Sequence, residues 1–127
     1  MTEQGIDPIV LYTLLAEAAG ESPEGMYYVA SSMQNRANRK KQNLRQVVDA
    51  PNQYAGRWRP DLEQFAIRQP EATRAMATQA IVRAMQEPAP GITNYLTTQL
   101  FNSDKSPGWS RKMKVLKQLG GHTFLGE

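Results

Sequence analysis

The chain has 127 residues, of which 40% are hydrophobic, and its formal net charge is +3 at pH 7. This size and composition are typical of a globular protein with one core, so we expect residues 1–127 to form a single domain. The chain has no cysteine, which excludes disulfides and cysteine chemistry, and its single histidine, His122, argues against a histidine-rich metal site. We expect no metal and no cofactor, so any catalysis must rest on carboxylates, amides, hydroxyls or tyrosines.

The N-terminal third predicts two helices in succession. Asp7-Pro8 has the order of an N-cap and a first helical residue, and apolar residues then recur at helical spacing, which predicts a helix over about 8–19 that ends at Gly20. Ser22-Pro23 repeats the same start signal and predicts a second helix over about 23–39. Its expected buried residues are Met26, Val29, Ala30 and Met33.

The middle of the chain predicts a short helical turn over about 44–49 and then a loop over 50–61. This loop is rich in turn-forming residues, yet it carries Tyr54 and Trp58. Because loops expose aromatic side chains only at a cost, the loop is a candidate for binding. A further helix is expected from about 70 to 87, where Glu87-Pro88 stops it.

The C-terminal third is expected to be less helical. Prolines and a glycine forbid a helix at the start of 88–101, where isoleucine, tyrosine and threonines predict a short extended segment. A last helix is predicted over about 109–119, ended by Gly120-Gly121, with an extended tail at 122–127. The fold class expected from these elements is mainly α, with at most a small β-hairpin.

The stretch AEAAGESPEG places Glu17 at the end of the first predicted helix and Glu21 four residues later. The helix dipole disfavours the charged form of a carboxylate at that end, and burial would act in the same direction. A glutamate that holds a proton is what a general acid for glycosidic bond cleavage needs. The alternative is a solvated helix end. If Gly20 turns the chain, Glu21 can instead accept hydrogen bonds at the start of the second helix.

Four segments in a fixed order extend over about residues 11–125. They are AEAAGESPEGMYYVASSMQNR from Ala16 to Arg36, Asn52-Gln53-Tyr54 after Pro51, Gly91 to Tyr95, and finally WSRKM followed by GHTF. Together they resemble the cell-wall hydrolase family of the spore-cortex-lytic enzyme type. Two positions depart from the family pattern, because Met26 stands where a Gln is usual and Asn94 where a His is common.

The resemblance implies a compact, lysozyme-like, mainly helical domain that cleaves the glycan strand of peptidoglycan between N-acetylmuramic acid and N-acetylglucosamine by lytic transglycosylation. Glu17 inherits the acid role by position. One glutamate suffices for this reaction, because the C6 hydroxyl of the muramic sugar attacks its own C1, whereas an ordinary glycosidase needs a second carboxylate, for which Glu21 is the main candidate. The residues expected to bind the glycan are Glu21, Gln53, Tyr54 and Tyr95.

Other polar and aromatic residues are expected to be structural or solvated. Tyr54 and Tyr95 have an alternative interpretation as core tyrosines. Trp109 is expected to anchor the last helix by packing, Trp58 to be the better exposed aromatic, and His122 to be a hydrogen-bonded structural histidine. The basic clusters within 36–45 and 111–117 are expected to be solvated helix faces, with attraction to an anionic wall polymer as the second interpretation.

The expected partner is the peptidoglycan glycan strand, with phage virion subunits as further candidates. The sequence has no long apolar run and no standard signal sequence, so we expect no membrane insertion, and a protein that is cytoplasmic until released as a phage endolysin, or virion-associated. The departures at Met26 and Asn94 favour a non-catalytic glycan-binding or virion assembly protein instead. Nucleic acid is not expected as a partner, because only the basic clusters suggest it.

Overall fold

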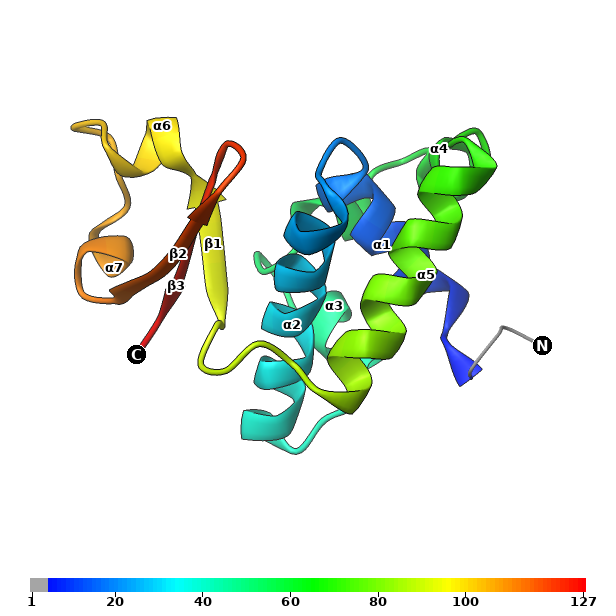
Figure 1. Cartoon of the computed structure of the whole chain (residues 1–127), viewed down its shortest axis with the longest axis horizontal. Coiled ribbons are helices and arrows are strands. Elements are labelled where there is room, and N and C mark those ends of the chain that lie inside the picture. Colours follow the sequence, from blue (N-terminus) through cyan, green and yellow to red (C-terminus); the bar gives the residue numbers. More distant parts are fainter. Residues whose placement is uncertain (1–4) are drawn as a thin grey trace.

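The computed structural model describes residues 5–127, and in it a group of helices lies beside a small sheet (Figure 1). The sheet and the two short helices next to it form one side of the molecule, and α2 separates them from the other long helices (Figure 1). In chain order, the elements are α1 (Pro8–Ala18), α2 (Pro23–Lys40), α3 (Leu44–Asp49), the 3-10 turn η2 (Ala55–Trp58), α4 (Leu62–Ile67), α5 (Glu71–Gln86), β1 (Asn94–Thr97), α6 (Thr98–Phe101), α7 (Gly108–Arg111), β2 (Lys114–Leu119) and β3 (His122–Gly126).

The two N-terminal helices begin where their caps predict. The Asp7 side chain accepts a hydrogen bond from the Ile9 amide at 2.8 Å, and Ser22 accepts one from the Gly25 amide at 3.2 Å. In each helix a proline occupies the first position, where no backbone donor is needed. Both helices therefore lie within one residue of their predicted bounds.

The core is built around α2, which packs against α1 and α5. The buried face predicted for α2 is confirmed, because no residue on it is more than 3% exposed. These residues are Met26, Val29, Ala30 and Met33. Burying a side chain of this size contributes about 1.5–3 kcal/mol. No helix within residues 5–127 combines the length and the apolar character that crossing a membrane requires.

The sheet has three antiparallel strands in the order β1-β3-β2. Tyr95 on β1 pairs with Phe124 on β3, and Leu119 pairs with His122 across the turn between β2 and β3. The expected fold class, mainly helical with a little β-structure, is confirmed, although the sheet has one strand more than a hairpin. The short helices α4 and α6 were not predicted.

The helix predicted over 109–119 is wrong. The structure instead has the single turn α7 followed by the strand β2. The Gly120-Gly121 pair forms the two-residue loop of a hairpin, with φ +58° at Gly120, and does not terminate a helix. Lys114 and Lys117 therefore lie on a strand and do not belong to a helix face. Backbone pairing with β3, which local periodicity cannot reveal, decides this segment.

Candidate active site

A pocket of about 370 Å³ lies where the end of α1, the loop after α3 and strand β1 meet. Within the described part of the chain, Glu17 is the only acid among its lining residues. The predicted site residues Gln53, Tyr54 and Tyr95 lie around the same pocket. The full lining is Glu17, Arg36, Asn52, Gln53, Tyr54, Ala55, Asn94, Tyr95 and Trp109.

Both carboxylate oxygens of Glu17 accept hydrogen bonds. Oε2 accepts from the backbone N–H of Gly56 at 2.6 Å, and Oε1 accepts from the Tyr95 hydroxyl. The first donor belongs to the loop after α3 and the second to the sheet. Glu17 is therefore oriented by two segments that are far from it in the sequence.

Gly56 allows this close approach because it has no side chain. A Cβ at this position would lie 2.7 Å from Glu17 Oε2 and 2.8 Å from the Ala16 Cβ, both closer than real Cβ contacts. Only glycine lets the backbone N–H reach the carboxylate without displacing the loop. Sequence reasoning did not single out Gly56, since nothing near it in the chain shows that α1 lies against it.

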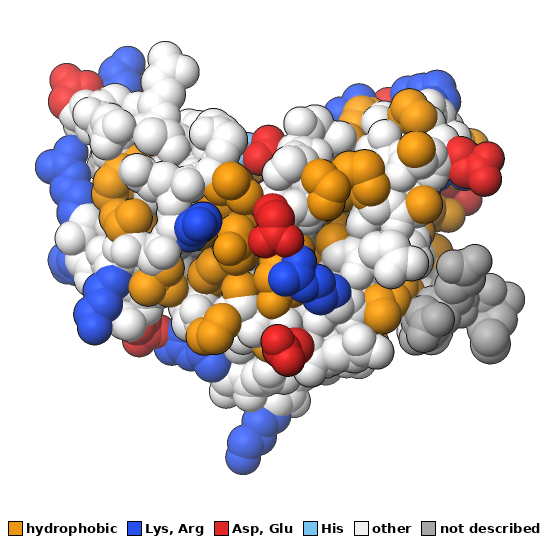
Figure 2. All heavy atoms as spheres, viewed as in Figure 1, with side chains coloured by type: hydrophobic (Ala, Val, Ile, Leu, Met, Phe, Trp, Pro, Cys, Tyr) orange, Lys and Arg blue, Asp and Glu red, His pale blue; other side chains and the backbone are white. Residues whose placement is uncertain are grey.

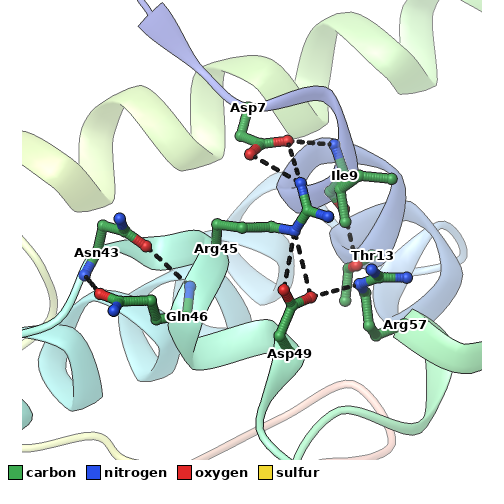
Figure 3. Close-up of polar contacts among 8 residues, drawn as sticks. All are labelled: Asp7, Ile9, Thr13, Asn43, Arg45, Gln46, Asp49 and Arg57. Carbon is green, nitrogen blue, oxygen red and sulfur yellow. Dashed lines mark hydrogen bonds and ion pairs between the residues drawn. The ribbon is translucent and has the colours of Figure 1, made fainter.

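A cluster of ion pairs holds the Gly56 loop (Figure 3). Asp49 accepts from Arg57 Nε at 2.7 Å and from Arg45 Nε at 3.0 Å, and Arg45 Nη1 also lies 3.2 Å from Asp7 Oδ2. Asp7 is the N-cap of α1, so the cluster connects the start of α1 to α3 and to η2. It fixes the residue that follows Gly56, and thereby the donor to Glu17.

The charges in this cluster stabilise one another. Burial acts against ionisation of Asp49, but the hydrogen bond and charge of Arg57, followed by those of Arg45, outweigh it and lower the pKa of Asp49. The hydrogen bond to Asp7 is the main cause that raises the pKa of Arg45. Asp49 and Arg45 are therefore both charged at neutral pH.

Tyr95 reaches Glu17 from β1 and is held among aromatic rings. Its ring centroid lies 5.9 Å from that of Phe124 and 6.4 Å from that of Tyr54. Burial raises the pKa of Tyr95 well above the usual 10.0, and the charge of Glu17 and the hydrogen bond to it add to this effect. The phenol therefore keeps its proton and remains a donor to Glu17.

Tyr54 is among the residues that line the pocket, but its hydroxyl bonds to a buried residue of α2. The residue is 2% exposed, and its hydroxyl lies 2.9 Å from Ser32 Oγ. Ser32 donates its own proton to the Val29 carbonyl at 2.6 Å, so Tyr54 is the donor of this pair. This arrangement corresponds to a core tyrosine with a satisfied hydroxyl, and a glycan contact by Tyr54 stays a prediction that involves only its ring.

Arg36 was expected on a solvated helix face, and this expectation is wrong. Its Nε donates to the Thr93 carbonyl at 2.6 Å, and its Nη1 donates to the Gln53 side chain. When the Asn94 amide oxygen faces Arg36, this oxygen accepts from Nη2 at 2.6 Å. Arg36 therefore connects α2 to the loop that carries Gln53 and to the start of β1, and it positions the amides of Gln53 and Asn94.

The preceding residue, Asn35, fixes the segment that leads into β1. Its side-chain amide donates to the carbonyls of Ala89 and Ile92 at 2.7 and 2.8 Å. Asn35 and Arg36 thus attach β1 to α2, which places Tyr95 opposite Glu17. The available sequence signal was the Asn35-Arg36 pair within the first of the four ordered segments.

The two tryptophans differ in how they relate to the pocket. Trp109 lines it and is 44% exposed, so the expectation that Trp109 is a packing anchor is wrong. Trp58 is 55% exposed and Arg57 stacks over its ring at 4.4 Å, which confirms it as the better exposed aromatic. Trp58 does not line the pocket.

Glu21 and His122 lie behind Tyr95. His122 Nδ1 is 3.1 Å from Glu21 Oε1, although the two atoms are not aligned for a hydrogen bond. The His122 ring meets the Tyr95 ring edge-on at 5.9 Å. Glu21 does not line the pocket, and its contact with the glycan stays a prediction.

The two departures from the family pattern have different positions. Met26 is fully buried in the core and does not line the pocket, whereas Asn94 does line it. Larger hollows of about 440 and 610 Å³ lie along α5, but neither includes Glu17 or the donors to it. Within residues 5–127 no group of His, Asp and Glu could hold a metal ion.

Comparison with known families identifies the family of this chain but does not test its site residues. The family described as Cell Wall Hydrolase matches residues 20–125, so the chain belongs to the cell wall hydrolase family. Comparison with curated proteins gave no match, and comparison with solved structures gave none either. The matched segment contains Gly56, Tyr95 and Trp109 but begins after Glu17. The assignment of Glu17 therefore rests on its geometry and on the local sequence pattern.

Proposed function

We propose that this cell wall hydrolase is a peptidoglycan lytic transglycosylase, which cleaves the β-1,4 bond between N-acetylmuramic acid and N-acetylglucosamine. The observation that carries the proposal is Glu17, a lone pocket acid oriented by the Gly56 amide and the Tyr95 hydroxyl. A glycosidase with two carboxylates places them about 5–9.5 Å apart across the scissile bond. Among the described residues that line the pocket, Glu17 has no such partner, which favours a reaction that needs one acid.

In the first step, protonated Glu17 gives its proton to the O4 of N-acetylglucosamine as the bond from this oxygen to the muramic C1 breaks. Negative charge develops on the Glu17 carboxylate while positive charge develops at C1. The donors from Gly56 and Tyr95 already point at the carboxylate and stabilise the charge that appears there.

In the second step, the Glu17 carboxylate takes the proton of the muramic C6 hydroxyl while O6 bonds to C1. This closes a 1,6-anhydro ring and returns the proton to Glu17, so the cycle consumes no water. Gln53, Asn94 and Trp109 are the side chains available to bind the sugars: the amides by hydrogen bonds and the indole by stacking on a pyranose face.

Hydrolysis by the same acid is the second candidate reaction, which would make the protein a muramidase. The observation that favours it is the set of amides in the pocket wall, from Asn52, Gln53 and Asn94, which could hold a water molecule beside C1. Glu17 would then remove a proton from this water instead of from the C6 hydroxyl. The two reactions give different chain ends, so product analysis separates them.

Action at the bacterial cell wall, as a phage endolysin or a virion-associated protein, is part of this proposal. The family and the Glu17 pocket support turnover at the wall. The alternative is a non-catalytic glycan-binding or virion assembly protein, in which the same pocket would bind a glycan without cleaving it.

The test is mass spectrometry of the soluble products released from purified peptidoglycan. Wild type should release fragments that end in 1,6-anhydromuramic acid, and Glu17→Gln should release them about 10³-fold more slowly. The matched control is Glu63→Gln, an exposed acid on α4 outside the pocket, which should equal wild type. Glu17→Gln should still sediment with insoluble peptidoglycan, because the amide keeps the shape of the side chain but cannot act as an acid.

Three other results would change the proposal. Reducing ends in place of anhydro ends would make the protein a muramidase. Full activity of Glu17→Gln would remove Glu17 from the mechanism. No products from folded wild-type protein would overturn catalysis and favour the non-catalytic alternative.

A further inference from the structure

A second hollow, of about 290 Å³, borders the active-site pocket and is strongly basic. It lies beside the last turns of α2, and Lys and Arg side chains project at the end of the molecule where α2 ends (Figure 2). We call it the basic hollow. Its lining residues are Arg36, Arg39, Lys40, Gln53, Thr93 and Asn94.

The basic hollow is continuous with the site of cleavage. Arg36, Gln53 and Asn94 line both the basic hollow and the Glu17 pocket. A glycan bound over Glu17 would therefore lie next to the basic hollow. Arg36 belongs to this shared wall, and Arg39 and Lys40 line the same hollow, unlike the cations on β2.

The positive charge of the basic hollow is only partly neutralised. Arg39 pairs with Glu127, but within residues 5–127 no carboxylate lies within 4 Å of the charged nitrogens of Arg36 or Lys40. The partners of Arg36 are a carbonyl and side-chain amides, which satisfy its donors without cancelling its charge. Cations near a helix C-terminus also complement the helix dipole, which accounts for Arg39 and Lys40 in the last turn of α2 but not for Arg36 on the wall shared with the pocket.

We propose that the basic hollow binds carboxylates of the stem peptide, the peptide that muramic acid carries on its lactyl group. This inference rests on the proposed function. The sugar rings of the glycan are neutral, so the charged group nearest to the bond being cleaved is on the muramic substituent. Anionic groups are what a hollow with three cations and no lining acid attracts. The enzyme therefore prefers peptidoglycan whose stem peptides are acidic.

The test compares soluble peptidoglycan fragments in their native form with the same fragments after chemical amidation of the stem carboxylates. For wild type at low ionic strength, amidation should raise KM about tenfold with little change in kcat. Lys40→Gln should raise KM about threefold on native fragments and should leave KM on amidated fragments unchanged.

Lys41→Gln is the matched control. It removes the same charge one residue away, from an exposed side chain that does not line the basic hollow. It should behave like wild type on both substrates. The double variant Arg39→Gln with Lys40→Gln should raise KM on native fragments about tenfold, which is close to the effect of amidation.

The possible failures are distinguishable. Equal KM on native and amidated fragments, with Glu17-dependent products from both, would overturn the basic hollow and leave the proposed reaction intact. An equal loss in Lys40→Gln and Lys41→Gln would mean general attraction to an anionic polymer, wall teichoic phosphates included, and would also overturn it. No product from either substrate would remove the proposed function and this inference together.

Discussion

The two walls of the Glu17 pocket hold the same carboxylate in different ways. On the helical wall, the donor is the backbone N–H of Gly56, which can reach the carboxylate because Gly56 has no side chain and which is held by the ion pairs of Arg57. On the sheet wall, the donor is the Tyr95 side chain, held by ring contacts with Phe124 and His122. The helical wall therefore supplies a backbone donor, and the sheet wall supplies a donor on a packed side chain.

This difference indicates that the two walls contribute differently to substrate binding. Ion pairs hold the residue that follows Gly56, so the Gly56 N–H and the Tyr95 hydroxyl together orient the acid. The sheet wall adds the half-exposed Trp109, and its edge strand β2 leaves Val115 and Leu116 47% and 42% exposed. Exposed side chains can adjust to a polymer, so we expect the sheet wall to affect substrate binding more than the helical wall does.

The strongest way to break the helical wall is Gly56→Ala. The new Cβ would collide with Glu17 Oε2 and the Ala16 Cβ, so the loop or the carboxylate must move. We expect about a 10²-fold loss of kcat, because an error of about 1 Å at a reacting group has this effect, and about 1–3 kcal/mol lower free energy of unfolding. Product release and urea denaturation measure the two effects.

The control for this change is Gly20→Ala. A Cβ at Gly20 would have no neighbour within 4 Å, so activity and stability should stay within about 0.5 kcal/mol of wild type. If Gly56→Ala were as active as Gly20→Ala, the close approach of the Gly56 backbone to Glu17 would have no catalytic role.

The corresponding change on the sheet wall is Tyr95→Phe. It removes the donor to Glu17 Oε1 but keeps the ring contacts, so we expect kcat to fall about 10²-fold while KM and stability change little. Steady-state kinetics and thermal unfolding are the measurements. Tyr12→Phe, a partly buried tyrosine outside the pocket, should be silent in both. Full kcat in Tyr95→Phe would mean that the helical wall alone orients the acid.

The part of this site that the sequence predicted is the part with local signals. The caps at Asp7 and Ser22 determine where α1 and α2 start, and Gly20 marks the end of the first helix, so Glu17 could be placed at a helix terminus. The ordered motif segments led to Gln53 and Tyr95, which the fold then brings to the same pocket as Glu17.

The rest depends on contacts between distant segments, which periodicity does not reveal. Gly56 is 39 residues from Glu17 in the chain, and Arg36 reaches Thr93 across 57 residues. The strand β2 forms because β3 pairs with it, and its own pattern resembled a helix before Gly120-Gly121. Trp109 faces the pocket because α7 is a single turn and not the start of a long helix.

A smaller effect is expected from Trp109→Ala, which tests the binding role of the sheet wall. Because the indole is exposed, stability should stay within about 0.5 kcal/mol, while lost stacking on the sugar should raise KM several-fold. Trp58→Ala, which removes a similarly exposed indole outside the pocket, is the control and should leave KM unchanged. A fall in kcat without a change in KM would contradict the expectation that the sheet wall contributes mainly to substrate binding.

The smallest effect concerns the ion pairs behind the helical wall, and pH reveals it. The pKa of Asp49 is lowered from its usual 3.8, so its ion pairs stabilise the fold above about pH 4, and this contribution is lost as pH falls through the lowered pKa. We expect the thermal unfolding temperature of wild type to decrease once the pH is below about 4. The unfolding temperature of Asp49→Asn should already be lower than that of wild type at neutral pH, and it should decrease less in acid.

Thermal unfolding of both proteins between about pH 7 and pH 2 measures this difference. Asp104→Asn is the control, since Asp104 is exposed and forms no ion pair within residues 5–127, and its profile should follow wild type. The Asp49 side chain is 37% exposed, so water screens its ion pairs and the shift should be small. If Asp49→Asn kept the wild-type profile, the Gly56 loop would owe its position to the packing of η2 against α1, and the helical wall would remain rigid in acid.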